Sequence, residues 1–208
     1  MNVDIGACLS NGFERVKNNP LFYIVGFLIF VFGGAISFQI LSGPLMVGYM
    51  RGMMKEDRGQ RAEIGDVFSG FNDFVPALIA HLVGGLIVAV GFFLCVIPGL
   101  LILPLVWLSL YAVAAGDKDG INAIKTSWNI VMNNMVTLAL AAFVFGLVGM
   151  LGALACGIGQ FFTIPVAFAA IYRMCQIAHA SAAPAPTFAP PGGMPPGPGG
   201  MPPMGPPR

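Results

Sequence analysis

Four aspartates are the residues of this chain best placed for metal or acid–base chemistry. Asp66, Asp73, Asp117 and Asp119 flank long uncharged runs, and two such carboxylates could hold a divalent cation beside a phospholipid headgroup. Asp66 also stands just before an apolar helix, where a carboxylate commonly caps free N–H groups. No His, Cys and Glu residues have the spacing of a metal site or catalytic set. We therefore expect no enzymatic activity and no cofactor.

His81 and Gln39 are two of the few polar residues inside the uncharged runs. Histidine changes its charge near neutral pH, so in an apolar helix it is a candidate proton-coupled or substrate-contacting residue. The alternative is a neutral histidine that is hydrogen-bonded to a neighbouring helix. We consider His81 and Gln39 together as a candidate intramembrane polar site and leave both interpretations open.

The elements around these residues are predicted from where charge is missing. Residues 18–50, 74–116 and 126–172 contain no Asp, Glu, Lys or Arg, and 57% of the chain is hydrophobic. A helix that crosses the ~30 Å hydrocarbon layer needs ~20 mostly apolar residues and excludes charge. At ~1.5 Å per residue the runs could reach roughly 50, 64 and 70 Å, which favours two spans in each. The pattern predicts an all-α polytopic membrane helix bundle of six spans, and whether residues 36–54 fully cross stays open.

The positions of the basic residues predict the orientation. If each run forms a hairpin, all ten Lys and Arg fall on one side of the membrane, and the positive-inside rule makes that side cytoplasmic. The first residues lack the basic region and cleavage site of a signal peptide. We expect an integral membrane protein with both termini in the cytoplasm.

An internal repeat with a period of about 57 residues is also predicted. An apolar triplet at spacing i, i+4, i+7 precedes each run and indicates a short helix lying in the membrane interface. These predicted interfacial anchors are Leu9, Phe13 and Val16, then Val67, Phe71 and Phe74, then Ile124, Trp128 and Val131. Each unit, at residues 3–60, 61–117 and 118–178, would consist of an interfacial helix, a span, a turn and a proline-bearing span.

The same order of motifs resembles a group of uncharacterised bacterial six-span membrane proteins, related to the membrane domain of some glycerophosphodiester phosphodiesterases. The motifs are Gly43-Pro44-Leu45 with Gly48 and Tyr49, Gly65-Asp66-Val67-Phe68-Ser69-Gly70-Phe71 with Phe74 and Leu78, Ile97-Pro98-Gly99, and Ala123 with Ser127-Trp128 and Asn133-Asn134. The resemblance covers about residues 5–178. It implies a six-helix fold in a bacterial cytoplasmic membrane and no established chemistry.

The last segment, residues 181–208, differs from the membrane domain (1–180) in composition. It is rich in Pro and Gly, which predicts a disordered cytoplasmic tail with polyproline II character. Such a tail could dock on a cytoplasmic protein or be an inert extension. Cys95 and Cys156 lie near the predicted outer turns, where they could form a disulfide or behave as small apolar residues.

These features favour a non-enzymatic membrane protein that acts through contacts with membrane lipids or with a protein, as a scaffold or accessory. The alternative is a transporter or channel for a small or lipid-like substrate. That alternative predicts a cavity that reaches His81 or Gln39. We expect no nucleic-acid partner, and the oligomeric state stays open.

Overall fold

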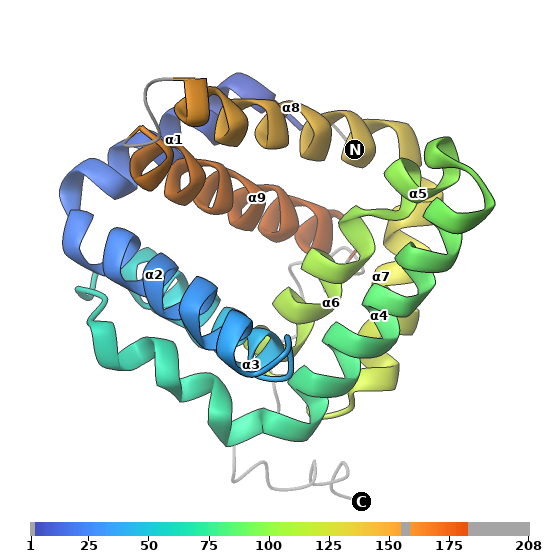
Figure 1. Cartoon of the computed structure of the whole chain (residues 1–208), viewed down its shortest axis with the longest axis horizontal. Helices are drawn as coiled ribbons and strands as arrows, with labels where there is room; N and C mark the ends of the chain where they lie inside the picture. Colours follow the sequence, from blue (N-terminus) through green and yellow to red (C-terminus); the bar gives the residue numbers. More distant parts are fainter. Residues whose placement is uncertain (1–2, 155–158, 183–208) are drawn as a thin grey trace, which may run out of the picture.

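The computed structural model describes residues 3–154 and 159–182, and every regular element in these two ranges is helical (Figure 1). The all-α fold predicted from the sequence is confirmed. The helices are α1 (Ile5–Asn18), α2 (Pro20–Ile36), α3 (Ser42–Asp57), the 3-10 helix η1 (Ile64–Asp73), α4 (Phe74–Leu94), α5 (Val96–Ile102), α6 (Pro104–Ala115), α7 (Gly120–Asn133), α8 (Met135–Leu154) and α9 (Gln160–Ala182). The predicted tail lies outside the described residues apart from its first two positions, which end α9.

Four helical stretches are long and apolar enough to cross a membrane. They are Ile64–Leu94, Val96–Ala115, Met135–Gly152 and Gln160–Ala182, and a fifth is added if the bent pair of α1 and α2 forms one span. Helix α3 does not reach this standard, because it has only 16 residues and its last two turns carry Arg51, Lys55, Glu56 and Asp57. Length and composition thus give four or five candidate spans in the described residues, against the six predicted.

A sharp corner separates α1 from α2, whose axes differ by 101°. Asp4 begins α1 by accepting a hydrogen bond from the backbone N–H of Ala7 (2.9 Å). Asn19 ends it with φ −139°, because a residue that precedes proline disfavours the helical region. Pro20 then occupies the first position of α2, where its missing N–H costs nothing.

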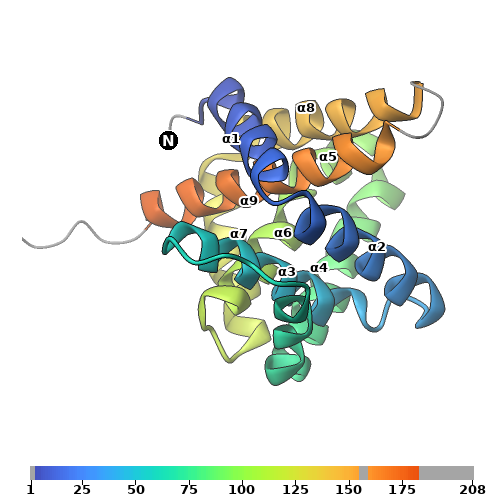
Figure 2. The same cartoon turned by 90° about the vertical axis from the view of Figure 1, so that its left-hand side faces the viewer.

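Helix α1 packs closely against α9, as Figure 2 shows. Gly12 makes this approach possible, because a Cβ atom there would lie 2.7 Å from the Val166 carbonyl oxygen. Cys8 and Val16, on the same face of α1, are buried. The first helix is therefore part of the packed domain.

Helix α3 contains an unbroken buried stretch from Ser42 to Met50. Its closest neighbour is η1. A Cβ atom on Gly48 would lie 1.8 Å from the Val67 carbonyl oxygen, and one on Gly70 would lie 1.9 Å from the Pro44 carbonyl oxygen. The two backbones touch at reciprocal glycines, as small residues allow in helices packed within a bilayer.

Two of the described turns, between α2 and α3 and between α4 and α5, expose apolar side chains. The α2–α3 turn places Phe38 and Gln39 at φ 49° and 71°, a left-handed conformation that is uncommon for residues with side chains. Phe38 in this turn and Phe93 at the end of α4 are each 91% exposed. Cys95, at the break between α4 and α5, is exposed as well. Cys156, the residue with which it could form a disulfide, lies outside the described residues.

The glycine contact between α3 and η1 predicts a selective loss of stability. Gly70→Ala forces a methyl group into the Pro44 carbonyl, and we expect a loss of about 1–3 kcal/mol, seen as a melting temperature lower by about 3–10 °C in detergent. Gly85→Ala in α4 is the matched control, since nothing lies within 4 Å of its added Cβ and alanine favours a helix over glycine. Equal melting temperatures for the two variants would show that α3 and η1 are not in contact.

Candidate functional site

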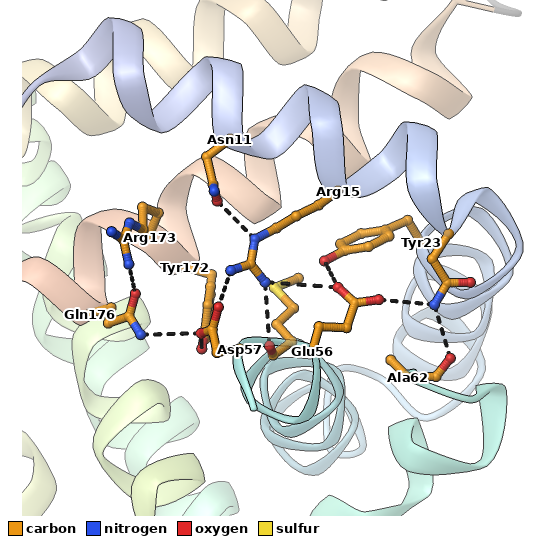
Figure 3. A network of polar contacts seen from close by, with 11 residues as sticks. Asn11, Arg15, Tyr23, Glu56, Asp57, Ala62, Tyr172, Arg173 and Gln176 are labelled. Carbon is orange, nitrogen blue, oxygen red and sulfur yellow. Dashed lines mark hydrogen bonds and ion pairs between the residues drawn. The ribbon is translucent and has the colours of Figure 1, made fainter. Parts of the chain in front are cut away.

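The last two turns of α3 carry four charged residues, and each is bound by a side chain from another part of the chain. We call Arg51, Lys55, Glu56 and Asp57, together with the side chains that bind them, the α3 cluster. The partners are Arg15, Asn19, Tyr23, Asp66, Asp73, Tyr172 and Gln176. Figure 3 shows the part of the cluster around Glu56 and Asp57.

Arg15 joins α1 to α3. Its guanidinium pairs with Asp57 and lies 3.8 Å from a carboxylate oxygen of Glu56. It also donates to the Asn11 side chain (2.8 Å) and to the Met53 carbonyl (3.3 Å). Burial lowers the pKa of the Arg15 guanidinium, but Tyr23 and Asp57 raise it by more, so its pKa lies above the ordinary value and the side chain stays charged.

Glu56 and Asp57 accept hydrogen bonds from residues near the start of the chain and from α9 (Figure 3). Glu56 accepts from the Tyr23 hydroxyl (2.7 Å) and the Asn19 amide (2.9 Å). Asp57 accepts from the Tyr172 hydroxyl (2.5 Å) and the Gln176 amide (3.1 Å) on α9. The two adjacent carboxylates are thus satisfied by α1, the start of α2, and α9.

The two basic residues of α3 bind the next part of the chain. Arg51 pairs with Asp73 at the end of η1 and donates to the Ser69 carbonyl (2.8 Å) within η1. It also lies 3.4 Å from the carbonyls of Val113 and Ala114, where a cation stabilises the C-terminus of a helix. Lys55 pairs with Asp66 (3.1 Å), which also accepts from the backbone N–H of Glu63.

The four aspartates that suggested chemistry are therefore separated by their contacts. Asp66 and Asp73 bind different basic residues of α3. Asp117 accepts from the Asn122 amide, and Asp119 caps Ile121 at the start of α7. Within the described residues, no group of three His, Cys, Asp or Glu residues could hold a metal ion. Asp66 and Asp73 thus join η1 to α3, whereas Asp117 and Asp119 make local contacts at the start of α7.

His81 lies at a contact between two helices, whereas Gln39 lies in a turn. The His81 Cβ would lie 2.9 Å from a Cβ placed on Gly43, so His81 marks where α3 crosses α4. Its Nδ1 is buried and has no hydrogen-bond partner in the part of the chain that the structure describes. Gln39 lies in the α2–α3 turn, where its side-chain oxygen accepts from the Ser42 hydroxyl (2.8 Å). Gln39 is thus a turn residue here.

The nine predicted anchors fall into three groups by exposure. Val16, Val67, Ile124 and Val131 are buried, and Leu9, Phe71 and Phe74 are half-buried. Phe13 and Trp128 are 63% and 38% exposed. The helical spacing correctly grouped residues on one face of α1 and α7, but that face is shared between the core and the surface. Their role as membrane anchors stays a prediction.

Pockets surround the helices at several places. A polar pocket of about 560 Å³ lies beside the α3 cluster and is lined by residues that include Asn11, Asn18, Gln60 and Arg61. An apolar groove of about 450 Å³ lies between α1, α8 and α9, and another of about 420 Å³ lies between α6, α8 and α9. Neither His81 nor Gln39 lines any of these three spaces in the part of the chain that the structure describes. None of the three is therefore the cavity that the transporter alternative predicts.

Sequence reasoning missed the α3 cluster, although it noted several of its members. Asp66 was expected to cap a helix, and it accepts from the Glu63 backbone N–H at the start of η1. That Asp66 and Asp73 also pair with Lys55 and Arg51 of α3 was not predicted. Tyr23 and Tyr172 were not connected to Glu56 and Asp57. The available signal was that tyrosines and carboxylates recur at the same end of the predicted spans, but spacing along the chain does not show which of them meet.

Comparison with known proteins gives a family and nothing more specific. Residues 29–191 match the family described as "Domain of unknown function (DUF7847)". Because this match covers most of the chain, the protein belongs to that family. No curated protein and no solved structure matches the chain, and the resemblance to the membrane domain of glycerophosphodiester phosphodiesterases stays a prediction.

The contacts of Arg15 predict a strong dependence of stability on its partner Asp57. Arg15→Gln and Asp57→Asn should each destabilise the protein by about 2–4 kcal/mol, because each leaves a partly buried charge without its partner. The double variant should lose less than the sum, with a coupling of about 0.5–3 kcal/mol. Thermal unfolding of the purified protein measures these losses. Lys118→Gln, which removes an exposed lysine, is the control, and additive effects at Arg15 and Asp57 would contradict the observed pair.

Proposed function

We propose that this member of the DUF7847 family is an integral membrane protein that acts through lipid contacts at its charged end, and that it has no catalytic reaction of its own. The observation that carries this proposal is the α3 cluster. Charged residues from segments far apart in the chain meet there and bind one another. The long apolar helices, in contrast, contain almost no charge.

The convergence supports a chain threaded from one side of a membrane. Arg15 of α1, Asp66 and Asp73 of η1, the end of α6 and Gln176 of α9 all reach the charged end of α3. A chain that crossed the membrane an odd number of times between these segments would place some of them on opposite sides. The positive-inside rule then assigns this end to the cytoplasm.

The order of elements supports three units of similar design. A short helix is followed by a helical hairpin in α1 with α2 and α3, in η1 with α4 to α6, and in α7 with α8 and α9. Each hairpin leaves and returns on the charged side. The period of about 57 residues favours such a threefold arrangement.

The α2–α3 hairpin enters the membrane less deeply than the others in this scheme. Helix α2 has 17 residues and is therefore ~26 Å long, and the uncharged part of α3 is shorter still. Neither reaches the ~30 Å of a hydrocarbon core. Its exposed apolar turn at Phe38 suits a position inside the hydrocarbon, and the chain still returns to the side from which it came.

Exposed aromatic side chains on the three short helices supply the contacts with lipid. Phe13 on α1, Phe68 on η1 and Trp128 on α7 are 63%, 51% and 38% exposed. Trp and Phe on the apolar face of an interfacial helix enter the boundary between headgroups and acyl chains. Phe13 and Phe68 lie at the charged end of the protein, because α1 and η1 contact the α3 cluster. Trp128 lies on α7, which follows the end of α6 that Arg51 contacts.

Single cysteines introduced into a chain without its four native cysteines test the threading. Glu14→Cys, Gln60→Cys and Lys118→Cys should all react with a membrane-impermeant maleimide from the same side, since all three residues are exposed at the charged end. Phe38→Cys should react from neither side until detergent is added. If Glu14→Cys and Lys118→Cys react from opposite sides of intact vesicles, the threading is wrong.

Depth-dependent quenching tests the contacts with lipid. In a Trp107→Phe chain, Trp128 is the remaining tryptophan. Lipids with bromine close to the headgroup should quench its fluorescence at least twofold more than lipids brominated near the chain end. The reverse order would place α7 in the middle of the bilayer, and no quenching by either lipid would remove the proposed contact.

A further inference from the structure

The apolar groove between α1, α8 and α9 differs from the other spaces by its position and its lining. It lies at the 101° corner where the chain passes from α1 into α2. Its walls are formed by Phe13, Val16, Pro20, Val148, Phe162 and Val166. Its volume is about 450 Å³, and in a membrane protein its walls face hydrocarbon.

Two polar residues line this groove, and only one of them can bind a ligand. Thr163 turns its hydroxyl to the carbonyl oxygens of Gly149 (3.0 Å) and Gly159 (3.2 Å), so it adds no free polar group to the wall. Lys17 is exposed, and its ammonium group makes no ion pair within the described residues. The groove is therefore apolar, and the ammonium group of Lys17 at its edge can bind an anion.

The free lysine contrasts with the basic residues around it. Arg15, two residues earlier on the same helix, is turned to the opposite side and binds Glu56 and Asp57. Lys55 and Arg51 are likewise bound to carboxylates. Because Lys17 makes no ion pair within the described residues, its ammonium group can pair with an acidic ligand. The apolar walls of the groove lie directly beside it.

We propose that this groove binds an acidic phospholipid, with one acyl chain along the apolar walls and the phosphate on the ammonium group of Lys17. The ligand fits because it combines an anionic headgroup with a hydrocarbon chain, as the groove combines a cation with an apolar wall. A zwitterionic phospholipid fits the walls equally but gains less from Lys17. This inference rests on the proposed membrane location, and it adds a site and a lipid class to it.

The test places a reporter in the groove of the full chain. Phe162 is 53% exposed and lines the groove, so Phe162→Trp in a Trp107→Phe, Trp128→Phe background gives one tryptophan beside the bound chain. The protein is reconstituted in vesicles that contain brominated phosphatidylglycerol or brominated phosphatidylcholine. One basic residue near the membrane surface contributes about 1 kcal/mol toward acidic lipid, so phosphatidylglycerol should bind about fivefold more tightly, as judged from quenching in lipid mixtures.

Four variants separate the proposed site from a general attraction between the protein and acidic lipid. Lys17→Gln should reduce the preference to about onefold, Lys17→Arg should keep it, and Lys118→Gln, which removes an exposed lysine outside the groove, should leave it unchanged. Val148→Phe should weaken quenching by both lipids, because it fills the wall. A preference that survives Lys17→Gln, or that Lys118→Gln removes equally, overturns the site.

The outcomes also distinguish the site from the proposed function. Strong and equal quenching by both lipids means that the groove is in the membrane but is filled by any lipid, so the specific site fails and the membrane location stands. An absence of quenching by either lipid means that the groove does not contact hydrocarbon, and both proposals fail together.

Discussion

Ionised side chains are not left unpaired where water is scarce, and the rest of the structure depends on this constraint. The charges at the end of α3 are held by partners from α1, α2, η1 and α9. Removal of one partner from such a pair costs far more than the pair itself contributes. The α3 cluster therefore contributes little net stability, but it determines which helices pack against one another. A competing arrangement of the same apolar helices would leave at least one of these charges alone.

Between the helices themselves, lipid supplies no hydrophobic driving force, so close packing has to hold them together. Gly48 and Gly70 bring the backbones of α3 and η1 into contact, and Gly12 does the same for α1 and α9. At each of these places a side chain would meet a carbonyl oxygen. Two separate features thus hold the helices together. One is close backbone packing at a few glycines, and the other is the pairing of charges at one end of α3.

The exclusion of charge from three long runs was sufficient to predict helices and membrane character, because this constraint acts on every residue of a span. The same constraint did not predict the structure of α3, which is too short to cross a bilayer and carries four charges in its last two turns. Helical spacing identified one apolar face of α1, yet Val16 on that face is buried and Phe13 is exposed, because spacing shows a direction and not what lies there. Gln39 was expected inside a span and instead forms a turn, since the first hairpin is shorter than its uncharged run. The partners of Glu56 and Asp57 lie far along the chain, which no local pattern records.

The hydrogen bonds from Tyr172 and Gln176 to Asp57 join residues separated by more than one hundred positions. A ribosome therefore completes the first two hairpins well before it makes the helix that supplies these donors. Arg15 and Asp57 are both synthesised before α9, so Asp57 gains its two α9 donors only when this helix packs against α1 and α3. Closure of the domain around Asp57 therefore depends on the last described helix.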